Sequence, residues 1–118
     1  MAASEEVIAD LLTRFTDICA SEGGDGVRRV LGTVGTKSPL YKIEKAARLV
    51  ALESSKDPDA ALEEVDTLIG LIFNAEGDAY SSLWVPTGGG TNKEYWLAKS
   101  RKEVERVQKS LKRLIELQ

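Results

Sequence analysis

Three consecutive glycines at 88–90, followed by Thr91 and a predicted helix, have the residue types of a phosphate-binding loop. The free backbone amides at a helix N-terminus can bind a phosphate group. A phosphate loop, however, follows a strand and ends in Gly-Lys-Ser/Thr, whereas this stretch continues as Thr-Asn-Lys. The pattern therefore favours a hinge or docking loop over a nucleotide site.

A run of carboxylates could do acid–base work or hold a metal ion. It consists of Asp57, Asp59, Glu63, Glu64 and Asp66. The chain has no histidine, so the Glu-x-x-His pairs of carboxylate metal sites in helical bundles are absent. Acid–base catalysis near neutral pH would need a perturbed Glu or Lys. We therefore expect Asp57 to cap a helix, and Glu63 and Glu64 to lie on a solvated face.

Cys19 is the single cysteine of the chain, so it cannot form an internal disulfide. It falls on the apolar side of a predicted helix, where a cysteine packs as a small hydrophobic residue. We predict no catalytic residue, no metal site and no cofactor, and we expect the protein not to be an enzyme. A small thiol or carboxylate enzyme stays open as a third hypothesis, with Cys19, Glu63 and Glu64 as its candidates.

Four aromatic residues cluster around a predicted loop at 77–91: Tyr80, Trp84, Tyr95 and Trp96. In one interpretation they close the end of a helical bundle and keep their polar tips in water. In the other they form an interaction site, because Trp and Tyr are favoured anchors at protein interfaces. The sequence leaves both interpretations open.

Basic residues dominate the last predicted helix, where Glu105 and Lys109 form an i,i+4 pair. Seven of them follow the aromatic cluster: Lys99, Arg101, Lys102, Arg106, Lys109, Lys112 and Arg113. They form either a solvated charged face or a surface that docks onto an acidic protein, where charged contacts steer and orient the partners.

Helix signals predict how these side chains are positioned. We expect helices at 5–22, from Asp25 over about two turns, from Ser38–Pro39, at 58–76 after the Asp57 cap, and from the Asn92 cap to the end. Gly77 is expected to end the fourth of these, which is the most apolar and therefore central. On the last helix, an apolar row is interrupted at Ser100. The predicted fold is an all-α, up-down-up-down four-helix bundle with one long loop before the last helix, forming a single domain over 1–118.

Charge is spread unevenly over the 118 residues, whose net charge is −3. Residues 93–118 hold eight Lys/Arg and four Asp/Glu, a balance of +4, and the remaining residues have a balance of −7. A net negative chain is not expected to bind nucleic acid as its main partner. We also expect no secretory signal and no membrane span, because the longest apolar run, at 68–73, is too short.

Four segments share a layout with a known family: the alanine-rich YKIEKAARLVALES, the acidic ALEEVDTLIGLIFNAEGDAYSS, the loop LWVPTGGGTNKEYW and the lysine-rich ending KSLKRLIEL. In this layout the chain resembles the PsbQ-like extrinsic proteins of photosystem II, and more the algal and diatom members than the plant ones. The resemblance implies a bundle in the thylakoid lumen of the chloroplast. It also implies a subunit that binds the lumenal face of photosystem II, shields the manganese cluster and helps to retain calcium and chloride.

The resemblance further implies the partners, which are the photosystem II core and the other extrinsic subunits. The protein would be peripheral to the membrane rather than inserted, a monomer when free, and without a cofactor of its own. We predict that it docks electrostatically through the seven basic residues above together with Trp84, Tyr95 and Trp96. The alternative is a helical-bundle adaptor or regulatory protein in an unknown compartment, which holds a peptide or helix in an apolar groove and binds it regardless of salt.

Overall fold

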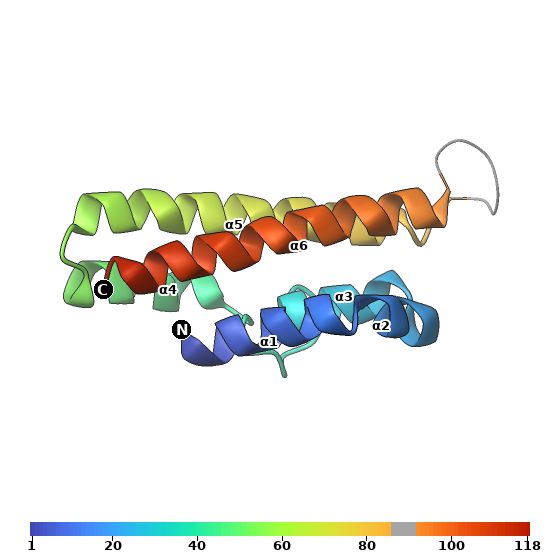
Figure 1. The fold of residues 1–118 in the computed structure, drawn as a ribbon, viewed down its shortest axis with the longest axis horizontal. Helices are drawn as coiled ribbons and strands as arrows, with labels where there is room; N and C mark the ends of the chain where they lie inside the picture. Colours follow the sequence, from blue (N-terminus) through green and yellow to red (C-terminus); the bar gives the residue numbers. More distant parts are fainter. Residues whose placement is uncertain (86–91) are drawn as a thin grey trace.

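The computed structural model describes residues 1–85 and 92–118, and within these ranges the chain is all-α and contains no strand (Figure 1). The predicted all-α class is therefore confirmed. The helices are α1 (Ala2–Thr13), α2 (Phe15–Glu22), α3 (Gly24–Leu31), α4 (Ile43–Ser54), α5 (Pro58–Ser81) and α6 (Lys93–Glu116). None of them has the length and apolar character that crossing a bilayer requires.

Helices α5 and α6, each of 24 residues, lie side by side along the length of the molecule (Figure 1). Val104, Val107 and Leu111 are fully buried on α6, as are Val65 and Leu68 on α5. Helix α5 also packs against α3 and α4, which confirms its predicted central position. The remaining helices therefore pack against the α5–α6 pair.

Two predicted caps are confirmed. The Asp57 carboxylate accepts a hydrogen bond of 3.2 Å from the Ala60 amide, and the Asn92 side chain accepts one of 2.9 Å from the Tyr95 amide. Each bond satisfies one of the amides that the first helical turn leaves without a partner. The two long helices therefore begin where the sequence predicts.

The predicted end of the central helix at Gly77 is wrong, because α5 continues to Ser81. A helical glycine costs about 1 kcal/mol relative to alanine, which buried contacts beyond it can offset. Ala79 and Ser82 are buried, and the Cβ of an alanine at Gly24 would come within 2.3 Å of the Ala79 carbonyl oxygen. This close approach of α3 stabilises the last turn of α5. The predicted loop at 77–91 is thus partly helical, and its residues 86–91, with the glycine run, lie outside the described residues.

The predicted first helix at 5–22 begins earlier, at Ala2, and is divided at Arg14 into α1 and α2. Arg14 has φ −105° and ψ 16°, values between the helical and extended regions. Hydrogen bonds nevertheless continue across the division, from Arg14 to the Asp10 carbonyl and from Ile18 to the Arg14 carbonyl. Helices α1 and α2 therefore form one arm with a local distortion. The predicted short helix that follows is confirmed as α3.

The predicted helix start at Ser38–Pro39 is wrong, because α4 begins only at Ile43. Ser38 does cap a turn, since its hydroxyl oxygen accepts a hydrogen bond from the Leu40 amide. Lys42 then adopts the left-handed conformation, with φ 55°, and separates this turn from the helix. The Leu40 side chain is buried, and its backbone closely approaches Gly32. This tertiary contact stabilises a turn at residues 38–42 instead of a first helical turn.

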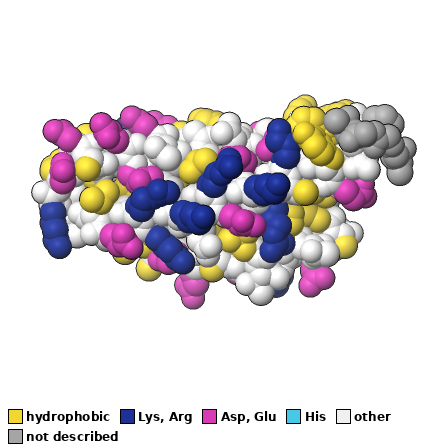
Figure 2. Space-filling model, turned by 45° about the horizontal axis from the view of Figure 1, so that its top comes forward, with side chains coloured by type: hydrophobic (Ala, Val, Ile, Leu, Met, Phe, Trp, Pro, Cys, Tyr) yellow, Lys and Arg dark blue, Asp and Glu magenta, His cyan; other side chains and the backbone are white. Residues whose placement is uncertain are grey.

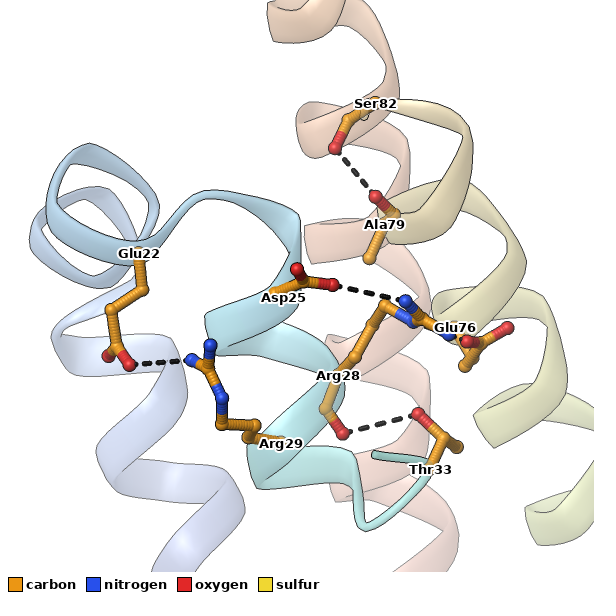
Figure 3. Close-up of polar contacts among 8 residues, drawn as sticks. All are labelled: Glu22, Asp25, Arg28, Arg29, Thr33, Glu76, Ala79 and Ser82. Atoms are coloured by element: carbon orange, nitrogen blue, oxygen red, sulfur yellow. Dashed lines mark hydrogen bonds and ion pairs between the residues drawn. The ribbon is translucent and has the colours of Figure 1, made fainter. Parts of the chain in front are cut away.

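Arg28 joins α3 to α5 (Figure 3). Its Nε lies 2.5 Å from Glu76 Oε1, its Nη1 lies 3.0 Å from Asp25 Oδ1, and its guanidinium lies 4.8 Å from the centre of the Tyr80 ring. The Arg28 and Glu76 side chains are only 17% and 21% exposed. Charged hydrogen bonds that are shielded from water in this way are among the stronger polar contacts.

Ser100 is not an interruption of the apolar row on α6. It is fully buried, and its hydroxyl donates a hydrogen bond of 2.8 Å to the Ala75 carbonyl oxygen of α5. Ala75 is also fully buried, and such small side chains let two helix backbones approach closely. The serine therefore marks the point where α6 lies tightly against α5.

Candidate docking surface on helix α6

Five basic residues form one row along the outer side of α6. They are separated by three, four, three and four positions, which places them on a single helix face: Lys99, Lys102, Arg106, Lys109 and Arg113. We call this set the α6 basic row. With a rise of about 1.5 Å per residue, it extends for about 21 Å. Figure 2 shows Lys and Arg side chains gathered along this face of the molecule.

The carboxylates that pair with the α6 basic row lie beneath it. Lys99 Nζ is 4.0 Å from Asp78 Oδ1, Arg106 Nη1 is 2.6 Å from Glu103 Oε1, and Arg113 Nε is 3.5 Å from Glu64 Oε1. These three carboxylate side chains are 13–15% exposed, whereas their cationic partners are 48–62% exposed. The charge that this face presents to solvent is therefore mainly positive.

Lys102 and Lys109 are exposed, and neither forms an ion pair with any residue in the described ranges. The predicted i,i+4 pair of Glu105 with Lys109 is absent from those ranges, because Glu105 lies 3.7 Å from Arg101 Nε instead. The ammonium groups of Lys102 and Lys109 are thus available to a partner without first breaking an ion pair with any described residue.

Arg101 and Lys112 do not belong to the same row. Arg101 lies two positions from Lys99, so it points to a different side of α6. Its guanidinium lies 5.4 Å from the centre of the Phe15 ring on α2. Lys112 follows Arg101 at helical spacing and is exposed. The seven predicted basic residues therefore divide into a row of five and a flanking pair.

Exposed aromatic side chains lie at the end of α5 and the start of α6. Tyr80, Trp84 and Tyr95 are 44%, 71% and 44% exposed. The rings of Tyr80 and Trp84 are 5.8 Å apart between centroids, and those of Tyr95 and Trp96 are 5.2 Å apart in an edge-to-face arrangement. In Figure 2, apolar side chains gather at this end of the basic face. We call these four residues the aromatic tip.

Trp96 differs from the other members of the aromatic tip, because it is partly buried. Its indole N–H is shielded from solvent and has no acceptor among the described residues. Lys99 Nζ lies 5.1 Å from the centre of this ring and 5.9 Å from that of Tyr95. A cation over two aromatic rings is stabilised by their electron-rich faces, so the aromatic tip and the α6 basic row meet at Lys99.

An apolar groove of about 390 Å³ separates α2 from the first half of α6. Its walls include Phe15, Cys19 and Leu97, and Lys93 and Arg101 are at its edge. Cys19 is buried, as predicted, and this burial raises the pKa of its thiol despite the two nearby cations. The thiol is therefore neutral near pH 7, which favours packing over nucleophilic chemistry.

The carboxylates of α5 are used in separate contacts. Asp66 Oδ1 lies 2.7 Å from Arg48 Nη2 of α4, and Glu64 Oε2 accepts a hydrogen bond of 2.7 Å from Ser110. Glu63 is exposed, as predicted, but the expectation of a solvated Glu64 is wrong because Ser110 and Arg113 hold it at the α5–α6 interface. Within the described ranges, no three Asp, Glu, Cys or His residues converge on a position that could hold a metal ion.

Sequence reasoning missed the partly buried carboxylates of the basic face. Asp78 and Glu103 are each less than one-fifth exposed. Burial raises the pKa of Asp78, with a small further increase from Glu103 and an opposing effect of Lys99. For Glu103 the sequence does contain an indication, because this residue is four positions from Lys99 and three from Arg106 on α6, which is the spacing of side chains that meet on one helix face.

Comparison of the chain with protein-family models, with curated proteins and with solved structures gives no match.

Proposed function

We propose that the chain is an accessory subunit that binds an acidic surface of a larger assembly through the α6 basic row. One observation carries the proposal: the row's cationic groups are exposed while the carboxylates that pair with them are largely buried. Such a surface attracts an acidic partner over about one Debye length, about 8 Å at physiological salt. The aromatic tip supplies large anchors at one end of the row.

The resemblance to PsbQ-like proteins supports a specific assembly, photosystem II at the lumenal side of the thylakoid membrane. In this proposal the up-down bundle has four helical segments. The first consists of α1 and α2 together, and the other three are α4, α5 and α6. Docking would shield the manganese cluster and slow the loss of calcium and chloride. The protein itself would contribute charge and shape rather than a reaction.

The test uses detergent-solubilised photosystem II from a diatom, stripped of its extrinsic subunits. The variant Lys102→Gln/Lys109→Gln removes two cations that have no ion pair among the described residues. The matched control, Lys42→Gln/Lys45→Gln, removes two exposed lysines beside and within α4. Because one exposed ion pair contributes up to about 1 kcal/mol, the first variant should bind about tenfold more weakly and the control as tightly as wild type.

Binding should also be lost at about 1 M salt, where the Debye length is about 3 Å. Recovery of oxygen evolution at low calcium and chloride should follow the bound fraction of each variant. The proposal is wrong if the protein stays bound at this salt concentration, or if both double variants weaken binding equally.

A second candidate function rests on the apolar groove between α2 and α6. A helical adaptor would hold an amphipathic peptide there, against Phe15 and Leu97. Binding of that kind survives high salt. It should be abolished by Ala98→Trp, because Ala98 is exposed and lines the groove. Photosystem II binding that is unaffected by Ala98→Trp would separate the two functions.

A further inference from the structure

A polar hollow of about 330 Å³ lies between α5 and α6, at Lys99, where the α6 basic row meets the aromatic tip. Its charged walls are Asp78 of α5 and Lys99 and Glu103 of α6. The side chains of Asp78 and Glu103 are only 15% and 13% exposed. Two carboxylates that are shielded from water in one hollow repel each other, so this position favours the uptake of a proton.

Asp78 is the more weakly neutralised of the two carboxylates. Arg106 Nη1 lies 2.6 Å from Glu103 Oε1, whereas Lys99 Nζ lies 4.0 Å from Asp78 Oδ1, the longest of the three ion pairs beneath the α6 basic row. Burial raises the pKa of Asp78 above its ordinary 3.8, Lys99 opposes this effect in part, and Glu103 adds a small increase. Asp78 therefore binds a proton at a higher pH than an exposed aspartate does.

Glu103 supplies a second, geometric indication. Its Oε2 is shielded from solvent and accepts no hydrogen bond from any residue that the structure describes. A buried acceptor without a donor costs free energy. A protonated carboxyl group is a donor, so a proton bound in the hollow can supply the donor that this oxygen lacks.

Few other charged groups act on Asp78, because the walls of the hollow come only from α5 and α6. Glu76, two positions earlier on α5, is turned away by about 200° and binds Arg28 of α3. On the side of α4, the carboxylate of α5 that forms an ion pair is Asp66, twelve positions away. Residues 86–91 contain no ionisable side chain. The charge of Asp78 is therefore controlled mainly by Lys99 and Glu103.

The charge of Asp78 decides how Lys99 is held. The Lys99 side chain is 48% exposed, and its Nζ lies between Asp78 and the rings of Trp96 and Tyr95, at 5.1 and 5.9 Å from their centres. When Asp78 is neutral, the ion pair is lost and the ammonium group is free to reach outward. The five cations of the α6 basic row then stand over two charged carboxylates instead of three, so the excess positive charge of this face rises from two to three.

We propose that Asp78 and Lys99 form a pH-sensitive switch of the docking surface: uptake of a proton by Asp78 releases Lys99 to the partner and makes binding tighter. The proton comes from solvent, and the only contact that is broken is the ion pair. The switch is a property of the chain itself, whereas its effect on binding rests on the proposed function. Acidification would thus favour the docked state from this side of the interface.

The first experiment is a pH titration of the full chain by nuclear magnetic resonance, which follows the side-chain carboxyl carbon of Asp78 and the Cε and Nζ of Lys99. The Lys99 signals should change with the same midpoint as Asp78. In Asp78→Asn, which keeps the shape of the side chain, this change should be absent. The matched control is Asp66→Asn, which alters another ion-paired but 67% exposed carboxylate of α5 and should leave the Lys99 titration unchanged. The proposal is overturned if Lys99 does not follow Asp78, or if it titrates equally in Asp78→Asn.

The second experiment measures binding to the stripped photosystem II at about pH 7.5 and about pH 5. Acidic groups of the partner also titrate, so the readout is the ratio of the affinities of Asp78→Asn and wild type. Asp78→Asn should bind about two- to fivefold more tightly at the higher pH, and the ratio should approach one on acidification. Asp66→Asn should bind like wild type at both values.

The two experiments distinguish failure of the switch from failure of the proposed function. If Lys99 follows Asp78 but the ratio of affinities does not depend on pH, the switch does not act on docking and the proposal is overturned. If neither wild type nor Asp78→Asn binds at any pH, the proposed function is wrong, and with it the effect of the switch on docking. The titration alone then decides whether Asp78 controls Lys99.

Discussion

Replacing Arg28 by methionine is expected to lower the free energy of unfolding by about 2 kcal/mol. Methionine keeps the apolar stem of the side chain but removes the charged hydrogen bonds to Glu76 and Asp25 and the stacking on Tyr80. A hydrogen bond to a charged group contributes about 1.5–3 kcal/mol, and removing one partner of a fully buried pair costs about 3–5 kcal/mol. Because Arg28 and Glu76 keep about one-fifth of their surface exposed, the lower range applies.

The control is Arg29→Met, one position along α3. Arg29 Nη1 also lies 2.8 Å from a carboxylate, Glu22 Oε1, but both side chains are 50% exposed (Figure 3). An exposed pair of this kind contributes less than about 1 kcal/mol. The difference between the two variants therefore measures the effect of shielding the pair from water, on the same helix and with the same substitution.

Urea denaturation followed by far-ultraviolet circular dichroism gives both free energies, and a double-mutant cycle with Glu76→Gln isolates the coupling. We expect a coupling energy of about 1.5 kcal/mol between Arg28 and Glu76 and a fall in Tm of about 8 °C for Arg28→Met. The reasoning is refuted if Arg28→Met costs no more than Arg29→Met, or if the cycle closes with a coupling energy near zero.

Three further predictions test the fold. Gly77→Ala should raise the free energy of unfolding by about 0.5–1 kcal/mol, since Gly77 is helical and a Cβ added there would have no neighbour within 4 Å. Gly24→Ala should instead lower the free energy of unfolding by about 2 kcal/mol or more, because the added Cβ would collide with α5. Denaturant titration checks both predictions. Ser100→Ala should cost about 1 kcal/mol and Ser100→Val about 1–3 kcal/mol, and a smaller cost for valine in the same titration would contradict the close packing of α5 and α6. Asp78→Asn should stabilise the protein at pH 7, because burial raises the pKa of Asp78 above its ordinary 3.8, so that wild type gains stability as pH falls through the raised pKa toward 3.8. The advantage of asparagine should therefore shrink on acidification, and an advantage independent of pH in thermal melts would argue against a buried, ionised Asp78.

Local signals in the sequence predict the starts of the long helices, because a cap acts within one turn. Asp57 and Asn92 bond to amides three residues away, and no distant part of the chain is needed. The end of α5 depends instead on α3, about fifty residues earlier in the chain. A prediction from helix propensity alone therefore ends this helix too early, at Gly77.

The candidate site likewise has features that local signals predict and features that depend on distant parts of the chain. Helical spacing identifies the basic residues of α6, but it does not indicate that Asp78 of α5 lies beneath Lys99. Hydrophobicity likewise gives no reason to expect that α4 buries alanines while leaving Leu49 and Leu52 exposed. That choice depends on how closely α4 approaches α5, where small side chains fit and large ones do not.

The two tryptophans give this protein two distinct optical reporters. Trp84, which follows the end of α5, is exposed to water, so it would emit at long wavelength and be quenched by iodide or acrylamide. Trp96, partly enclosed beside Lys99 on α6, would emit at shorter wavelength and resist the same quenchers. A partner that covers Trp84 and a loosening of α6 around Trp96 therefore change different components of the fluorescence, so these two events can be followed separately in the unlabelled chain.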